Sequence, residues 1–297
     1  MTDLASLAAR RSLGRSRSGA GLLPYLLVAP GTLIVAGFTI LSLSFTLCAS
    51  FTDWDIGKAK WGLIGLGNYL RAAADPLLIS SLIASFVFVA SVVALSIAVG
   101  FIIAVALNRK FRGRALLRGL VVAPWVISEL ATGVFWSLLL RTDGLFGQAL
   151  GGPLNSANGA MACLILVEVW RSVGFVTVMI LASLQTIDHS LFEAARVDGA
   201  TPLRTTWSIT IPLVSPSLII AAILLVIGNF NLVTMIIALT AGGPISATTT
   251  VALYMYQQSF VYFHIGYGAS IAIVMSVINV AAMLIFMAIQ RNVGMRQ

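Results

Sequence analysis

Apolar residues run along this chain in long stretches, and short polar segments separate them. The stretches cover residues 26–50, 77–107, 115–140, 159–183, 212–239 and 265–290. Each is long enough to cross about 30 Å of hydrocarbon, which takes about 20 helical residues. The stretches are continuous rather than alternating, which favours helices over the strands of a membrane barrel. The pattern predicts an all-α integral membrane protein with six transmembrane helices.

The most polar interval separates the fourth stretch from the fifth. It runs from Leu191 to Pro212 and reads LFEAARVDGATPLRTTWSITIP. The pattern predicts a short helix over 191–197, a sharp turn at Gly199 and a second helix that ends at Pro212. Its charges are costly in lipid, so the segment must be solvated or docked on a partner.

This interval also sets the predicted domain organisation. We expect a basic tail over 1–21, a six-helix domain over 22–290 that contains the polar loop 188–212, and a short tail over 291–297.

The composition agrees with a membrane protein, because 59% of the residues are hydrophobic and 9% are charged. About a quarter of the residues are charged in an average soluble domain.

The distribution of positive charge predicts the orientation. The net charge of +8 would also suit a nucleic-acid binder, but a lipid-embedded chain keeps Lys and Arg mainly on the cytoplasmic side. The two tails, the 108–118 loop and the polar interval hold thirteen of the eighteen Lys and Arg residues, and the opposite loops hold four. We therefore expect both termini and the 191–212 interval in the cytoplasm.

Cys48 and Cys163 lie inside apolar stretches, so neither a disulfide nor a metal site is expected.

Three ionisable residues, Glu129, Glu168 and Arg171, fall inside predicted membrane helices. Charges at this depth cost several kcal/mol, so they usually face a cavity or pair with each other. Glu168 and Arg171 are three residues apart and can form an ion pair, and Ser172 and Phe175 continue the same helix face. The pair lines a substrate path or only ties helices together, and Glu129 is either part of that path or a structural acid.

A polar motif, GNFN at 228–231, interrupts the fifth stretch. Amides in a bilayer helix are costly unless they are paired or hydrated, and an Asn side chain both donates and accepts hydrogen bonds, as sugar hydroxyls do. We therefore count Asn229 and Asn231 among the candidate substrate contacts, with helix packing as the alternative for Asn231.

The polar interval resembles the EAA loop of permease subunits in ATP-binding-cassette importers. The matching residues are Glu193, Ala194, Ala195, Gly199, Ile209 and Pro212. Four further motifs are similar to the sugar-importer branch, in particular to the first permease subunit of maltose and glycerol-3-phosphate importers. They are GLGNY at 65–69, FRGRALLR at 111–118, WRSVGF with LQTI within 170–187, and LTAGGP at 239–244.

The resemblance implies a type I importer permease core with both termini inside, in a bacterial cytoplasmic membrane. It implies a second permease, two ATPase subunits that hold ATP and Mg²⁺, an extracytoplasmic binding protein, and transport by alternating access. The chain itself lacks the motif G-x-x-x-x-G-K-[ST], so we expect it to have no nucleotide site and to be no enzyme. We also expect it to bind no cofactor, nucleic acid or metal.

The resemblance also assigns residues. The coupling loop of the family maps to the segment that holds our candidate coupling residues, Glu193, Ala194, Ala195, Arg196, Asp198, Gly199 and Pro212. Its sugar-contacting wall maps to Glu168, Arg171, Ser172, Phe175 and Asn229, and the polarity of the membrane helices adds Glu129 and Asn231 to the candidate substrate path. A second asparagine of the family's sugar site falls at Leu232 here, which leaves the substrate open. An oligosaccharide, amino sugar, polyol or glycerol-phosphate ester fits, and the charges at 168 and 171 suggest a charged one.

Two other classes of function compete with this one. An ion-coupled secondary transporter would use Glu129, Glu168 and Arg171 as a proton relay, but it gives the polar interval no role. A membrane-embedded enzyme would need acids, His or Cys gathered on one side, whereas His189 and His264 are predicted on opposite sides.

Overall fold

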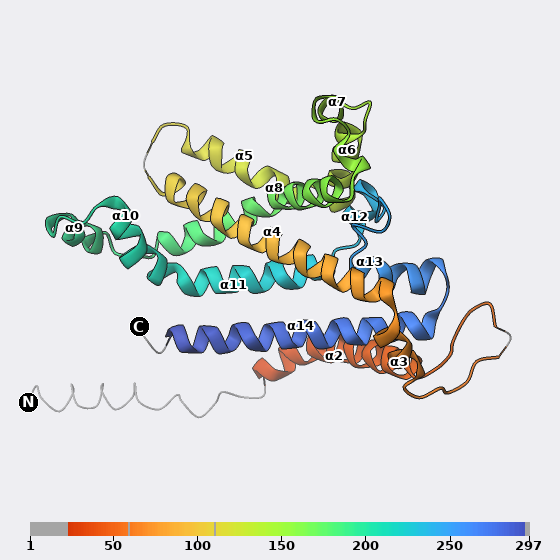
Figure 1. Cartoon of the computed structure of the whole chain (residues 1–297). Helices are drawn as coiled ribbons and strands as arrows, with labels where there is room; N and C mark the ends of the chain where they lie inside the picture. Colours follow the sequence, from red (N-terminus) through yellow and green to blue (C-terminus); the bar gives the residue numbers. More distant parts are fainter. Residues whose placement is uncertain (1–22, 59, 110, 295–297) are drawn as a thin grey trace, which may run out of the picture. The chain divides into compact units, whose positions relative to one another are not determined.

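The computed structural model describes residues 23–58, 60–109 and 111–294 (Figure 1), so the predicted basic tail over 1–21 lies outside the described residues. The chain divides into two units, residues 1–48 and 49–297. The described part of the first unit belongs to helix α2, Leu23–Ser50. Its hydroxyls at Thr32, Thr39 and Thr46 each donate to the carbonyl four residues earlier, at 2.8 to 3.0 Å, so these groups are satisfied inside an apolar helix.

The second unit is helical as well. Its elements are α3 (Gly67–Ala74), α4 (Pro76–Asn108), α5 (Arg114–Val126), α6 (Glu129–Leu140), α7 (Leu145–Leu150), η1 (Pro153–Asn155), α8 (Ala157–Leu184), α9 (His189–Val197), α10 (Pro202–Thr205), η2 (Thr206–Thr210), α11 (Ile211–Phe230), α12 (Thr234–Leu239), α13 (Val251–Tyr256), η3 (Gln257–Val261) and α14 (Ile265–Gly294). Extended pairing in the described residues is limited to one bridge between Thr52 and Leu63. The all-α class is confirmed.

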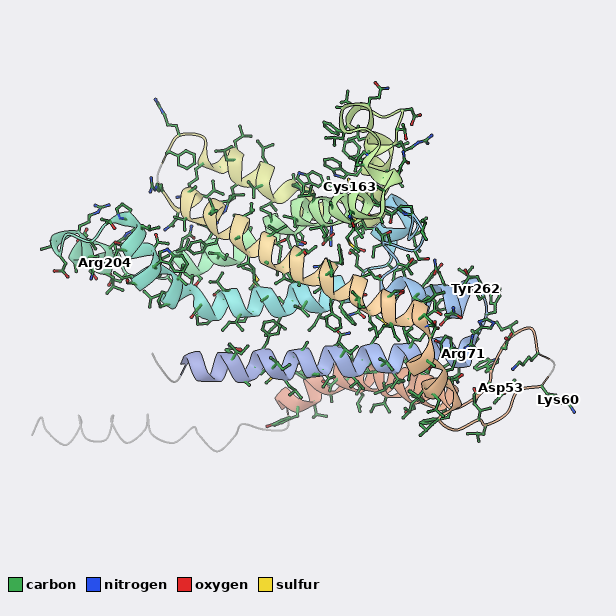
Figure 2. The ribbon with its side chains drawn as sticks, viewed as in Figure 1. Asp53, Lys60, Arg71, Cys163, Arg204 and Tyr262 are labelled. Carbon is green, nitrogen blue, oxygen red and sulfur yellow. The ribbon has the colours of Figure 1, made fainter. Side chains whose placement is uncertain are left out.

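Helix α8 lies at the centre of this unit and packs against α4, α5 and α11, while α14 packs against α11, α13 and α3. Figure 1 shows α9 and α10 at one end of the unit, together with the α4–α5 connection and the last turns of α14. Figure 2 shows Arg204 at that end and Asp53, Lys60, Arg71 and Tyr262 at the opposite end. We refer to these as the α9 end and the α3 end.

The third predicted span is not one straight helix. Helices α5 and α6 meet at an angle of 96°, so the described residues hold five long apolar helices, or six if the bent pair is counted as one span. Pro124 lies in the last turn of α5 and has no N–H to continue the hydrogen-bond pattern. Ile127 and Ser128 then adopt extended backbone angles before α6 begins at Glu129.

The fifth predicted span, 212–239, is also wrong as a single helix. Helix α11 ends at Phe230, and the short α12 packs against α6 instead. Asn231 ends α11 because its side-chain amide donates to the carbonyl of Ile227 at 2.7 Å, a bond that competes with the helix.

The expected helix end at Pro212 does not occur. A π-helical turn over Thr206–Thr210 leads directly into α11, and Pro212 occupies its first turn. Proline is tolerated at this position because the first turn of a helix needs few backbone donors. The polar interval is thus continuous with a membrane-spanning helix.

The α3 end is held together by Asp75, the residue that caps α4. Its carboxylate accepts hydrogen bonds from the hydroxyls of Tyr254, at 2.6 Å, and Tyr267, at 2.5 Å, and from the N–H of Leu77, at 2.9 Å. Burial raises the pKa of the Asp75 carboxyl, but these donors favour its charged form and bring its pKa below the ordinary value. Burial and the bond to Asp75 raise the pKa of Tyr254 to about 12.

Replacing Tyr254 with phenylalanine should therefore lower the free energy of unfolding by about 1.5–3 kcal/mol, the range for a hydrogen bond to a charged group. Thermal unfolding of the purified protein measures this effect. Tyr256→Phe is the matched control, because no hydrogen bond is described for its hydroxyl. Since the pKa of Asp75 is lowered on folding, its stabilisation should persist from pH 7 to 5 and be lost below about pH 4. Equal melting of both variants would contradict this role.

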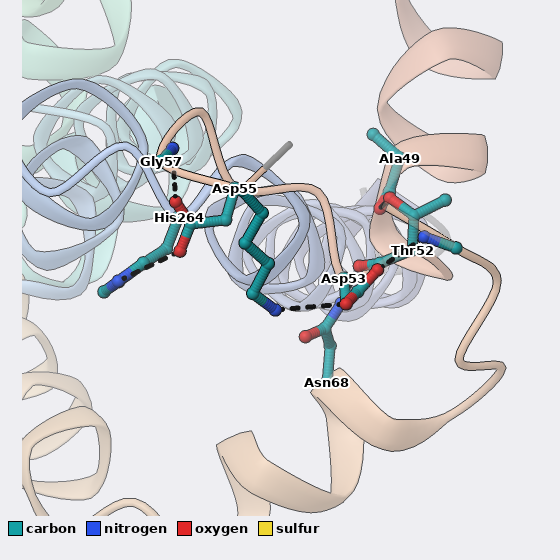
Figure 3. A network of polar contacts seen from close by, with 9 residues as sticks. Ala49, Thr52, Asp53, Asp55, Gly57, Asn68 and His264 are labelled. Carbon is teal, nitrogen blue, oxygen red and sulfur yellow. Dashed lines mark hydrogen bonds and ion pairs between the residues drawn. The ribbon is translucent and has the colours of Figure 1, made fainter. Parts of the chain in front are cut away.

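A polar loop, described over 51–58 and 60–66, precedes α3 and is held by its own side chains and by contacts with Asn68 and His264 (Figure 3). Asp53 accepts from the N–H of Gly62, at 2.6 Å, and from Lys58, at 3.0 Å, and the Gly62 bond is the main reason that the pKa of Asp53 is lowered. The Asn68 amide donates to the carbonyls of Ser50 and Thr52, at 2.9 and 2.7 Å. The loop is thereby anchored to the start of α3.

Close packing of α5 on α8 depends on Gly174. A Cβ at this position would lie 2.5 Å from the carbonyl oxygen of Val121 and 3.1 Å from the Cα of Val122. Gly174→Ala should therefore cost about 1–3 kcal/mol of stability through overpacking. Gly119→Ala in α5 is the control, because its Cβ would meet no described heavy atom within 4 Å and alanine favours helix. A lower melting temperature for the first variant alone is expected, and equal shifts would contradict the packing account.

Candidate functional site

A cavity of about 300 Å³ opens between α5, α6, α8 and α11, in the interior of the apolar helices. It is lined by Trp125, Glu129, Glu168, Arg171, Ser172, Phe175, Leu224, Leu225, Gly228 and Asn229. The bend between α5 and α6 places Glu129 at the first turn of α6. The bend therefore brings a charge from one helix to the charges of another.

Glu168 forms the base of the polar cluster. Its side chain is fully buried, and its carboxylate accepts three hydrogen bonds, from Nε and Nη2 of Arg171 at 2.9 and 2.7 Å and from the Ser172 hydroxyl at 2.8 Å. The two arginine bonds are bidentate, the strongest arrangement for this pair of groups. The ion pair predicted from the three-residue spacing is confirmed.

Arg171 also faces a second carboxylate. Its Nη2 lies 3.6 Å from Oε1 of Glu129, whose side chain is 40% exposed, whereas the side chain of Arg171 is 15% exposed. One guanidinium thus lies between two carboxylates. The more accessible of the two, Glu129, borders the cavity.

Asn229 and two aromatic rings complete the wall. The Asn229 side chain is buried, and its Nδ2 donates to the carbonyl of Leu225 at 2.9 Å. Its Oδ1 is buried and accepts no hydrogen bond from the described residues. The rings of Trp125 and Phe175 lie next to each other, with centroids 5.5 Å apart. The wall therefore combines a carboxylate, an amide oxygen and aromatic faces.

The structure brings six of the seven predicted substrate-path residues to this cavity and leaves out Asn231, which is exposed and bonded to its own helix. Sequence reasoning missed Trp125, Leu224 and Leu225. No motif marks these three, because they reach the wall through the packing of α5 and α11 on α8. Gly228 was visible only as part of GNFN. Leu232 is buried in the apolar core.

The predicted coupling residues gather at the α9 end. Asp188 caps α9 by accepting from the N–H of Ser190 at 2.9 Å, and this bond lowers the pKa of Asp188. Ala195 is the buried residue of α9. The exposed surface of the loop includes Glu193, Ala194, Arg196, Asp198, Gly199 and Pro212.

Gly199 ends α9 as predicted. Its φ is +72°, in the left-handed region. The N–H of Gly199 donates to the carbonyl of Arg196, and the N–H of Ala200 donates to the carbonyl of Ala195. This pair of bonds is a Schellman motif, in which glycine avoids the strain of a side chain. The turn fixes where the chain leaves α9 for α10.

Residues 96–295 match the family of binding-protein-dependent transport system inner membrane components. The chain belongs to this family. It is therefore the permease component of an ABC transporter in the cytoplasmic membrane and not the enzyme that hydrolyses ATP. This result agrees with the resemblance carried by the polar interval.

Several relatives match over most of their length. A probable ABC transporter permease of Sinorhizobium fredii is 35% identical over 254 residues, 81% of this chain and 82% of that protein. The trehalose/maltose transport system permease MalF of Thermococcus litoralis is 33% identical over 92% of this chain and 93% of its own length. The sn-glycerol-3-phosphate transport system permease UgpA of Yersinia pestis is 30% identical over 91% of this chain and 95% of its own length.

The fold has a solved counterpart. A chain in the crystal structure of a bacterial alginate ABC transporter, in complex with an alginate pentasaccharide-bound periplasmic protein, matches with a TM-score of 0.76 over 91% of this chain and 94% of that chain. The sequence identity is 17%, so this likeness concerns the fold. The type I importer permease fold expected from the sequence is confirmed.

Proposed function

We propose that this permease imports a carbohydrate or a related solute by alternating access, as one of two permease subunits in a complex with two ATPase subunits and an extracytoplasmic binding protein. The observation that carries the proposal is the polar cavity between α5, α6, α8 and α11. Ionisable residues inside membrane helices are rare and usually mark a solute path. The named permeases for trehalose/maltose and glycerol 3-phosphate support a polyhydroxylated solute.

The α9 end is the proposed contact with the ATPase. Its exposed charges and its small residues Ala194 and Gly199 suit close docking of a partner surface. The loop continues through the π turn into α11, which carries Asn229 to the cavity. A push on α9 would therefore reach the cavity wall through one continuous helical path. The distribution of Lys and Arg supports a cytoplasmic position for this end, with both termini inside.

Energy coupling tests this function. Proteoliposomes that hold the purified complex and its binding protein should accumulate solute only with ATP on the side of the α9 end, and vanadate should stop the uptake. Uptake driven by a proton gradient without ATP would instead favour an ion-coupled transporter that uses Glu129, Glu168 and Arg171.

A further inference from the structure

We infer that this wall of the cavity selects a solute that carries a protonated amine beside its hydroxyl groups, such as an amino-bearing carbohydrate, and disfavours phosphate esters and uronates. The inference rests on the proposed function, in which the cavity is the solute path. It follows from the charge of the lining, from the donors that the protein has already used, and from the acceptors that remain.

The lining carries net negative charge. Two of its side chains, Glu129 and Glu168, are acidic, and Arg171 is its one basic residue among the described lining residues. Arg171 is bound to Glu168 in a bidentate pair, which neutralises the buried carboxylate. The remaining charge lies on Glu129, the most exposed of the three side chains. An anion entering this cavity would meet a carboxylate that it repels.

The polar donors of the wall bind protein acceptors. Arg171 directs Nε and Nη2 to Glu168, and Ser172 directs its hydroxyl to the same carboxylate. The Asn229 amide nitrogen donates to a backbone carbonyl, which also fixes the orientation of that amide, since a carbonyl needs a donor. A phosphate or carboxylate ligand requires several free donors. The described bonds commit Nε and Nη2 of Arg171, the Ser172 hydroxyl and the Asn229 amide nitrogen to protein acceptors, so few side-chain donors of this wall are left for an anion.

The groups that remain include acceptors and aromatic faces. The buried Oδ1 of Asn229 has no hydrogen-bond donor among the described residues, and a buried acceptor of this kind is costly until a ligand supplies one. Glu129 offers a carboxylate for an ammonium group. Trp125 and Phe175 offer ring faces that attract a cation or cover the apolar face of a sugar. The set matches a ligand rich in N–H and O–H donors.

Three sugars of similar size and different charge test the inference. The full-length permease, purified in lipid nanodiscs with the subunits that accompany it, should bind glucosamine, at a pH where its amine is protonated, at least about tenfold more tightly than glucose. This is the effect of one charge-assisted hydrogen bond. Glucose 6-phosphate should bind more weakly than glucose. Isothermal titration calorimetry measures all three.

Glu129→Gln should remove the preference for the amine, so that the ratio of the affinities for glucosamine and glucose falls to about one. Asp143→Asn is the matched control, because Asp143 is an exposed acid that borders a different hollow together with Arg141. Equal affinities, tighter binding of glucose 6-phosphate, no binding of any of the three sugars, or a preference that depends on Asp143 would overturn the inference. Failure of the proposed function would instead appear as uptake that does not require ATP.

Discussion

Replacing Arg171 with alanine should destabilise the permease by about 3–5 kcal/mol, the usual cost of removing one partner from a buried ion pair. Glu168 is fully buried and receives two of its three hydrogen bonds from Arg171. Without the guanidinium, a carboxylate would remain in an apolar interior with one hydroxyl donor. We expect a large fall in melting temperature, or failure of the protein to accumulate in the membrane, measured by thermal unfolding and by fluorescence-detected gel filtration.

Two further variants separate the ion pair from a general effect of arginine loss. Arg141→Ala breaks a pair that is exposed on both sides and should cost less than about 1 kcal/mol. The double variant Glu168→Gln with Arg171→Met removes the buried charge together with its partner and should recover most of the lost stability. If Arg171→Ala melted like the unmodified protein, the guanidinium would not be the structural partner of Glu168.

Replacing Gly199 with valine should uncouple transport from ATP hydrolysis. A residue with a Cβ pays roughly 1–2 kcal/mol in the left-handed conformation that Gly199 adopts. Relief of that strain would change the direction in which the chain leaves α9. Since 1.4 kcal/mol corresponds to a factor of ten, we expect solute-stimulated ATP hydrolysis to fall about tenfold or more in the assembled complex.

Gly199→Asn is the matched control, because asparagine tolerates the left-handed region better than valine does. It should keep most of the coupled activity. The added Cβ meets no described atom within 4 Å, so a steric clash would not explain a difference between the two variants. Normal assembly and normal stimulated hydrolysis in Gly199→Val would rule out the turn as an element of coupling.

The sequence alone was sufficient to predict the features that depend on residues close together in the chain. Apolar length predicted the membrane helices, the three-residue spacing predicted the Glu168–Arg171 pair, and Gly199 predicted the end of α9. Each of these features depends on neighbours within one helix or one turn.

The sequence was insufficient where tertiary packing overrides an apolar pattern. The residues around Pro124 and Asn231 read as continuous membrane helices, yet the chain bends after the first and breaks after the second. Both departures shape the site, because the first turns Glu129 toward Arg171 and the second leaves Asn231 outside the cavity. Trp125 reaches the wall through the packing of α5 on α8, which no spacing rule predicts.

We propose that the α9 end docks on an ATPase, and site-specific cross-linking tests this docking most directly. A photoreactive amino acid at Val197, which is 88% exposed on α9, should form a covalent adduct in membranes with a protein that binds ATP. The same probe at Leu63, 83% exposed near the α3 end, should form no such adduct. We expect an ATPase adduct from position 197 alone. No adduct at 197, or equal adducts from both positions, would contradict it.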